Sequence, residues 1–175
     1  MTEKERNSIK RIMGNISTSS DGLIKQQTAF KAEFPFALSE TDHGIKLLQD
    51  ALSEKNEEDI DYAFYIAPFF RPFNENDIPL LIKVLESDCH TNHEDIIHEF
   101  EKMKSPQTIE ILFKTAQRRF DYFIRDEEYP LARPCIWALW KIGTEEAISK
   151  IKLLSEFNDE QVKAYATSQL INKRC

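Results

Sequence analysis

The sequence predicts an all-α protein, an α-solenoid of about four antiparallel helix pairs with an N-terminal helical cap. Apolar residues recur at helical spacing along most of the chain, and the pattern returns after about 30 residues. Only 4 of the 175 residues are glycine, which disfavours an architecture rich in β-turns. The repeat is clearest near the C-terminus, where two segments share apolar residues at i, i+4 and i+8: Leu131, Cys135 and Leu139, then Val162, Ala166 and Leu170.

The N-terminal segment, residues 1–40, matches no repeat. Ile9 and Ile12 predict a helix over residues 2–14 that ends at Gly14, a plausible C-cap. A second helix through Phe30 should stop before Pro35, because proline disfavours helix in the residue before it. We expect residues 1–40 to cap the open end of the array, and residues 41–175 to form the repeats within a single compact domain.

From residue 41 onward the chain alternates between two types of helix. The first helix of each pair carries two apolar anchors at i and i+3, followed by further apolar residues one turn later. The anchors are Ile45 with Leu48, Ile78 with Leu81, Ile109 with Leu112, and Ile148 with Ile151.

The second helices are predicted at Glu57–Ala67, Glu94–Met103, Leu131–Ile142 and Glu160–Ile171. Residues with N-cap preferences precede these helices or the first helices: Asn56, Asn92, Ser105, Thr144 and Asn158. Pro68 and Pro134 are expected to end or kink their helices. The third interval between anchors is longer than the others by about eight residues, which predicts a long helix or a projecting loop over Arg118–Tyr129.

Two adjacent repeats carry the series Ala138-Leu-x-Lys-Ile-Gly143, Glu146-Ala-Ile148, Leu153-Leu154 and Asn158-Asp-x-x-Val162-Lys163. This series resembles the second-helix, turn, first-helix, second-helix signature of HEAT-like repeat proteins of the short bacterial type. The resemblance implies an α-solenoid whose concave face is built mostly from second helices. It also implies binding far more often than catalysis, although the fold alone fixes no ligand.

Charge and composition narrow the classes of partner. The net charge of −7 weighs against nucleic acid and favours a basic protein partner. No run of 18 apolar residues is present, so we expect no membrane span. Residues 1–15 lack an apolar signal core, and the 3 cysteines are widely spaced, which predicts free thiols and a cytoplasmic location.

The candidate interaction residues lie on the second helices, opposite their core faces. On a helical wheel of Leu131–Ile142, Arg133, Trp137 and Trp140 fall away from the core, and Arg and Trp are frequent in binding hot spots. Trp140 is equally well explained by packing against a neighbouring pair. On the helix that starts at Glu57, the corresponding residues are Asp59, Tyr62 and Tyr65, which are also explained by local packing.

Acidic residues gather at the starts of the second helices, including Glu94 and Asp95. Their favourable interaction with the helix dipole is a sufficient local reason. Stacking of the repeats would nevertheless make them an acidic ridge that attracts a basic protein. The long interval adds further candidates for partner contact: Tyr122, Phe123, Arg125, Asp126, Glu127, Glu128 and Tyr129.

Signals for metal binding and catalysis are weak. Cys89, His90, His93 and His98 form the closest approach to a zinc pattern, but no second Cys/His pair accompanies them. We therefore predict no metal, no cofactor and no catalytic residues, with His90 and His93 in an exposed turn. No glycine-rich phosphate loop and no GxSxG, HExxH or CxxC motif occurs.

The function that the sequence favours is non-catalytic protein binding, most concretely a bacterial immunity protein that neutralises a basic toxin. The alternative is a general HEAT-like adaptor that docks an enzyme complex. A HEAT-like enzyme of the DNA-glycosylase or lyase type ranks last, because such an enzyme needs a basic groove and this chain is acidic. The oligomeric state is left open by the sequence.

Overall fold

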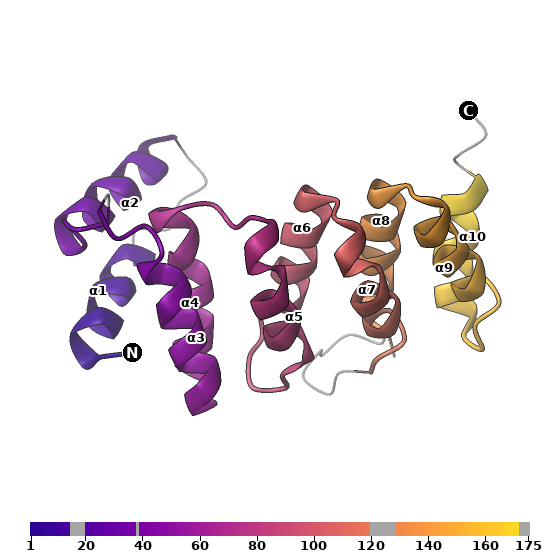
Figure 1. Cartoon of the computed structure of the whole chain (residues 1–175), viewed down its shortest axis with the longest axis horizontal. Coiled ribbons are helices and arrows are strands. Elements are labelled where there is room, and N and C mark those ends of the chain that lie inside the picture. The colour runs from indigo at the N-terminus through magenta and orange to yellow at the C-terminus, as the bar shows by residue number, and fades with distance from the viewer. Residues whose placement is uncertain (15–19, 38, 120–128, 172–175) are drawn as a thin grey trace. The chain divides into compact units, whose positions relative to one another are not determined.

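The computed structural model of the chain describes residues 1–14, 20–37, 39–119 and 129–171, and every regular element in this part is helical (Figure 1). The all-α prediction is thus confirmed. Two short 3₁₀ helices, η1 and η2, precede α5 and α7. The elements are α1 Glu3–Met13, α2 Ser20–Glu33, α3 His43–Glu54, α4 Glu57–Phe70, η1 Glu75–Asp77, α5 Ile78–Glu86, α6 His93–Met103, η2 Pro106–Thr108, α7 Ile109–Thr115, α8 Ala132–Ile142, α9 Glu145–Leu154 and α10 Glu160–Ile171.

The predicted second helices coincide with α4, α6, α8 and α10, but neither helix ends at its proline. Pro68 lies inside α4, which continues to Phe70. The proline falls in the last turn, where it cannot donate to the carbonyl of Phe64, and the helix ends two residues later. Pro134 lies in the first turn of α8, where the backbone N–H has no partner within the helix in any case.

Side-chain caps fix several helix starts. Thr2 and Glu5 form a capping box on α1. The Asn56 side chain accepts a hydrogen bond from the backbone N–H of Asp59, and Thr144 does the same for Ala147, as predicted. On α10 the cap is not the predicted Asn158, because Asp159 accepts from two backbone N–H groups of the first turn.

The described chain divides into two compact units, Met1–Phe73 with Ser87–His90, and Asn74–Glu86 with Thr91–Cys175. The first unit holds α1 to α4, so the predicted cap segment packs together with α3 and α4. The predicted boundary at residue 41 stays a prediction.

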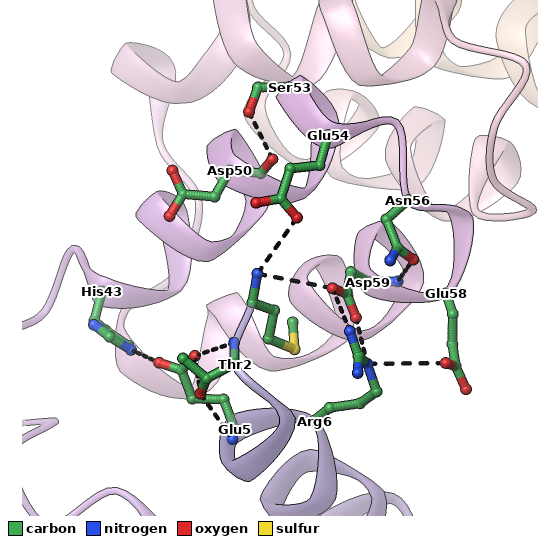
Figure 2. Close-up of polar contacts among 11 residues, drawn as sticks. Thr2, Glu5, Arg6, His43, Asp50, Ser53, Glu54, Asn56, Glu58 and Asp59 are labelled. Atoms are coloured by element: carbon green, nitrogen blue, oxygen red, sulfur yellow. Dashed lines mark hydrogen bonds and ion pairs between the residues drawn. The ribbon is translucent and has the colours of Figure 1, made fainter.

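An arginine–aspartate pair joins α1 to α4 in the first unit. The Arg6 guanidinium donates two hydrogen bonds of 2.7 Å to the two carboxylate oxygens of Asp59, and Figure 2 shows both. The Asp59 side chain is 1% exposed. Charge-assisted, bidentate bonds of this kind are strong. The amino group of Met1 lies 3.7 Å from Asp59 Oδ2 and is a second cationic partner of this carboxylate. A separate contact joins α1 to α3, where His43 Nε2 lies 3.0 Å from Glu5 Oε1.

Aromatic rings hold α2 against α4. The Phe30 ring meets Phe70 edge-on at a centroid distance of 5.0 Å, and Phe34 meets the same ring at 5.3 Å. All three residues are buried. Edge-to-face geometry adds to the free energy gained from burial, so this cluster fixes the second helix of the N-terminal segment.

Gly44 sets the approach of α3 to α4. A Cβ atom built on Gly44 would lie 2.6 Å from the Cα of Ala67, well inside any real contact. The neighbouring atom belongs to the backbone, so it cannot move aside as a flexible side chain would. The two helices are close because residue 44 has no side chain.

In the second unit, α8 is the central helix, since it contacts α6, α7, α9 and α10. The core of this unit includes Leu81, Phe100, Leu112 and Leu139, all fully buried. Cys135 in the same core is a free thiol whose pKa is raised well above its usual value by burial.

Among the described residues, no helix combines the length and apolar character that crossing a bilayer requires.

We predict that Gly44→Ala lowers the free energy of unfolding by about 1–3 kcal/mol, because the added methyl group overpacks the α3–α4 contact. The matched control is Gly14→Ala. Gly14 has a right-handed φ of −61° and room for a Cβ at 3.4 Å from the nearest atom, so its substitution should change stability little. Urea unfolding of both variants measures the difference, and equal effects would contradict this account of the contact.

We also predict an acid-sensitive contribution from Glu33. Hydrogen bonds from Arg11 and Ser8 lower its pKa from 4.5 to about 2. The pair therefore stabilises the fold fully above pH 4.5 and loses this effect as the pH falls toward 2. In both Glu33→Gln and Arg11→Met, the unfolding midpoint should depend less on pH across this window than in the natural protein. Unchanged pH dependence in both variants would show that the pair contributes nothing.

Candidate functional site

An open groove of about 750 Å³ lies across α6, α8 and α10 in the second unit. All three are predicted second helices. The groove brings together four of the residues predicted to bind a partner, Glu94, Asp95, Arg133 and Trp137. Lining residues from α10 include Gln169, so three segments far apart in the sequence build one surface.

The face of α8 that lines the groove is the one predicted from the helical wheel. Cys135 and Leu139 are fully buried on the core face. Trp137 on the opposite face is 43% exposed, and Arg133 is exposed beside it. Trp140 is half-buried. The packing of α8 thus commits one face to the core and presents an arginine and a tryptophan to the groove.

The Trp137 indole is held in place by α6. Its Nε1–H donates a hydrogen bond of 2.9 Å to Glu101 Oε1. The other oxygen of Glu101 lies 3.3 Å from Nδ1 of His98. Lys141 Nζ lies 4.9 Å from the centroid of the indole, within cation–π range. The edge of the ring and one of its faces are therefore already engaged, which orients the tryptophan before any partner binds.

A second cation–aromatic contact links α8 to α10. The Cζ atom of Arg133 lies 6.0 Å from the ring centroid of Tyr165. The Tyr165 hydroxyl accepts a hydrogen bond of 3.1 Å from Gln161 Nε2. Arg133 is thus placed over an aromatic ring, and the structure gives it no carboxylate partner among the described residues.

Two carboxylates at the start of α6 complete the groove. Glu94 and Asp95 are exposed in the first turn. Neither forms an ion pair or a side-chain hydrogen bond with any residue in the described ranges. Both are thus available to a basic group, and their position at a helix N-terminus stabilises their negative charge.

The predicted candidates on α4 have partners within the first unit. The sequence predicts Asp59 on the face of α4 away from the core, but the residue is buried and bonded to Arg6. Tyr62 donates to Glu58, and Tyr65 accepts from Gln26 of α2 at 2.9 Å. The reason is that α1 and α2 pack on this face of α4, which a wheel of α4 alone cannot reveal.

The candidates in the long interval fall mostly outside the described residues: Tyr122, Phe123, Arg125, Asp126, Glu127 and Glu128. Tyr129, at its end, is described. Its ring meets Phe157 edge-on at 5.3 Å and lies under the Arg119 guanidinium at the same distance. Tyr129 is therefore half-buried by intramolecular contacts.

The histidines of the zinc-like pattern are not in an exposed turn, contrary to the prediction. His90 is 1% exposed and His93 is fully buried at the first residue of α6. The prediction rested on Asn92 as an exposed helix cap, and a cap position does not reveal that the histidines on either side of it are buried. Within the described ranges, no three His, Cys, Asp or Glu side chains are grouped so as to hold a metal ion.

Sequence reasoning missed several lining residues of the groove. His98 and Glu101 follow Glu94 at i+4 and i+7 on α6, and Gln169 follows Tyr165 at i+4 on α10. The helical wheel that singled out Arg133 and Trp137 would have found His98 and Glu101 if applied to α6, whereas Gln169 falls at the core-face spacing of Val162 and Ala166.

No protein-family model, no curated protein and no solved structure matches the chain.

We predict that Trp137→Ala lowers the free energy of unfolding by about 1 kcal/mol or less, because the side chain is largely at the surface. Leu139→Ala, two residues away and fully buried, should cost roughly 2–5 kcal/mol through the cavity it leaves. Chemical unfolding of the two variants under identical conditions makes the comparison. If Trp137→Ala destabilises as much as Leu139→Ala, the assignment of the two faces of α8 is wrong.

Proposed function

We propose that the protein is a non-catalytic binding protein whose groove across α6, α8 and α10 receives a basic protein partner. The observation that carries the proposal is the meeting of Trp137 and Arg133 with the two unpaired carboxylates Glu94 and Asp95. Exposed tryptophan and arginine are typical of binding hot spots. Carboxylates without an internal partner supply charge complementarity to lysine or arginine.

The charge of the surroundings agrees with this proposal. The groove is lined by three carboxylates, Glu94, Asp95 and Glu101, and by one guanidinium, Arg133. The chain as a whole carries a net charge of −7. Such a field speeds the approach of a basic protein and repels a phosphate backbone, which is why nucleic acid is not the proposed partner.

The first unit supplies an internal precedent. On α4 the face equivalent to the groove is covered by α1, which carries the basic residues Arg6 and Lys10. Arg6 pairs with Asp59, and Lys10 Nζ lies 3.0 Å from Glu58 and 5.4 Å from the Tyr62 ring centroid. A basic segment on an acidic and aromatic helix face is thus an arrangement that this chain already uses.

The architecture that belongs to this proposal is an α-solenoid of about four helix pairs. The contacts of α8 with both α6 and α10 support it, because second helices of successive repeats should be neighbours. In its most concrete form, the protein is a cytoplasmic bacterial immunity protein that neutralises a basic toxin. This form of the proposal is supported by the small size of the chain, its acidic charge and the aromatic residues of the groove. A general adaptor is the alternative, and the identity of the partner separates the two.

The test is a charge reversal. The double variant Glu94→Lys/Asp95→Lys should weaken binding of a candidate basic partner, such as a toxin encoded beside this protein, by about 2 kcal/mol or more. The matched control is Glu145→Lys/Glu146→Lys, which makes the same change of charge at two exposed first-turn positions of α9 outside the groove. Calorimetric titration measures both affinities, and circular dichroism verifies the fold.

Equal loss of affinity in the two double variants would reduce the effect to net charge and contradict a role for the groove. Binding of duplex DNA that persists at moderate salt would replace the protein partner by nucleic acid.

A further inference from the structure

A glutamine side chain in the groove has no protein partner among the described residues. Gln169 on α10 is only 9% exposed, and its side chain lines the groove. Its amide makes no hydrogen bond with any residue in the part of the chain that the structure describes. The amide stays accessible from the groove, so it can pair with a bound segment.

We propose that the groove binds an extended, arginine-containing segment of the partner, and that Gln169 pairs with the main chain of that segment. This inference rests on the proposed function and names the chemistry of the bound segment. It combines three independent observations: the unpartnered amide, the two unpaired carboxylates, and the aromatic walls between them.

The amide selects a peptide group. A glutamine side chain offers N–H donors and one carbonyl acceptor, which complement the C=O and N–H of a peptide unit. These groups are free in an extended segment. In a helical segment they are bonded to one another, so a helix would leave Gln169 unsatisfied.

The carboxylates select a basic side chain, and arginine fits best. Glu94 and Asp95 are both acceptors, and the planar fork of a guanidinium can pair with a carboxylate through two parallel hydrogen bonds. The rings of Trp137 and Tyr165 already hold Lys141 and Arg133. A cation from the partner is therefore directed to the unpaired carboxylates rather than to the aromatic faces.

The width of the groove sets the length of the segment. Neighbouring packed helices lie about 8–10 Å apart, so the path from α6 across α8 to α10 measures roughly 16–20 Å. An extended chain covers about 3.3–3.6 Å per residue, and five or six residues span this path. Such a segment can place an arginine at α6 and a peptide group at Gln169 simultaneously.

The experiment uses a pool of acetylated and amidated hexapeptides with arginine fixed at the third position and the other positions varied. The probe is the indole N–H resonance of Trp137, identified by its loss in Trp137→Phe. We expect the pool to shift this resonance, and a pool with citrulline in place of arginine to bind at least tenfold more weakly. Glu94→Gln/Asp95→Asn should show the same loss, and Glu145→Gln/Glu146→Gln should show none.

Gln169→Met isolates the amide, because methionine has a similar length and no hydrogen-bonding amide. It should weaken peptide binding by about three- to tenfold, as expected for one or two hydrogen bonds. It should leave thermal stability unchanged or raised, since the amide has no internal partner. N-methylation of the peptide at one position should weaken binding to the natural protein and have no further effect on Gln169→Met.

The contrary outcomes are distinct. Equal binding of peptides by Gln169→Met, or a marked loss of its thermal stability, overturns the role of Gln169. If the citrulline pool binds as tightly as the arginine pool, the proposed preference for arginine is overturned. If sedimentation shows a dimer that dissociates when the peptides are added, the occupant of the groove is a second copy of the chain. That result overturns the proposal of a segment from another protein. No shift with any peptide at millimolar concentration, together with a groove-dependent full-length partner, overturns this mode of binding and leaves the proposed function intact.

Discussion

The packing around α8 is the constraint on which the second unit depends. This helix contacts α6, α7, α9 and α10, and such close packing needs a slender core face. Ala132, Cys135 and Ala138 are fully buried, and their small side chains let the neighbouring helices approach. Since that face is committed to the core, the larger polar and aromatic residues of α8 have only the opposite face. The groove is thus a consequence of how α8 packs, with α6 and α10 as its two walls.

Polar groups in the groove fall into two sets with different consequences. Glu101 is bonded to the Trp137 indole, and Arg133 lies over Tyr165, so these residues fix the shape of the surface before a partner arrives. Preorganisation of this kind lowers the free-energy cost of ordering side chains on binding. Glu94 and Gln169, in contrast, have no partner among the described residues, so they are available to a bound segment.

Local patterns in the sequence were enough to predict the helices but not the neighbours of each helix. The anchors and caps predicted the helix positions because both depend on residues within one or two turns, as at Thr144. The wheel of α8 predicted its exposed face correctly because its neighbours cover only one side. The same reasoning failed at Asp59, whose partner Arg6 lies 53 residues away in a segment that matches no repeat. Gln169 was missed because an unpartnered amide is recognised only when the surroundings of the side chain are known.

The contrast between α4 and the groove explains why charge alone would not hold a separate partner. Arg6 reaches Asp59 from the same chain, so this contact forms at the high effective concentration of an intramolecular reaction. A free partner must also offset the loss of translational and rotational freedom, estimated at 4–15 kcal/mol or more. Surface ion pairs to Glu94 and Asp95 contribute only about 0–1 kcal/mol each. The remaining free energy of binding would have to come from the burial of apolar surface. In the groove, the side chain of Trp137 is 43% exposed and provides such a surface. The carboxylates would then direct the partner to the site, and the tryptophan would retain it.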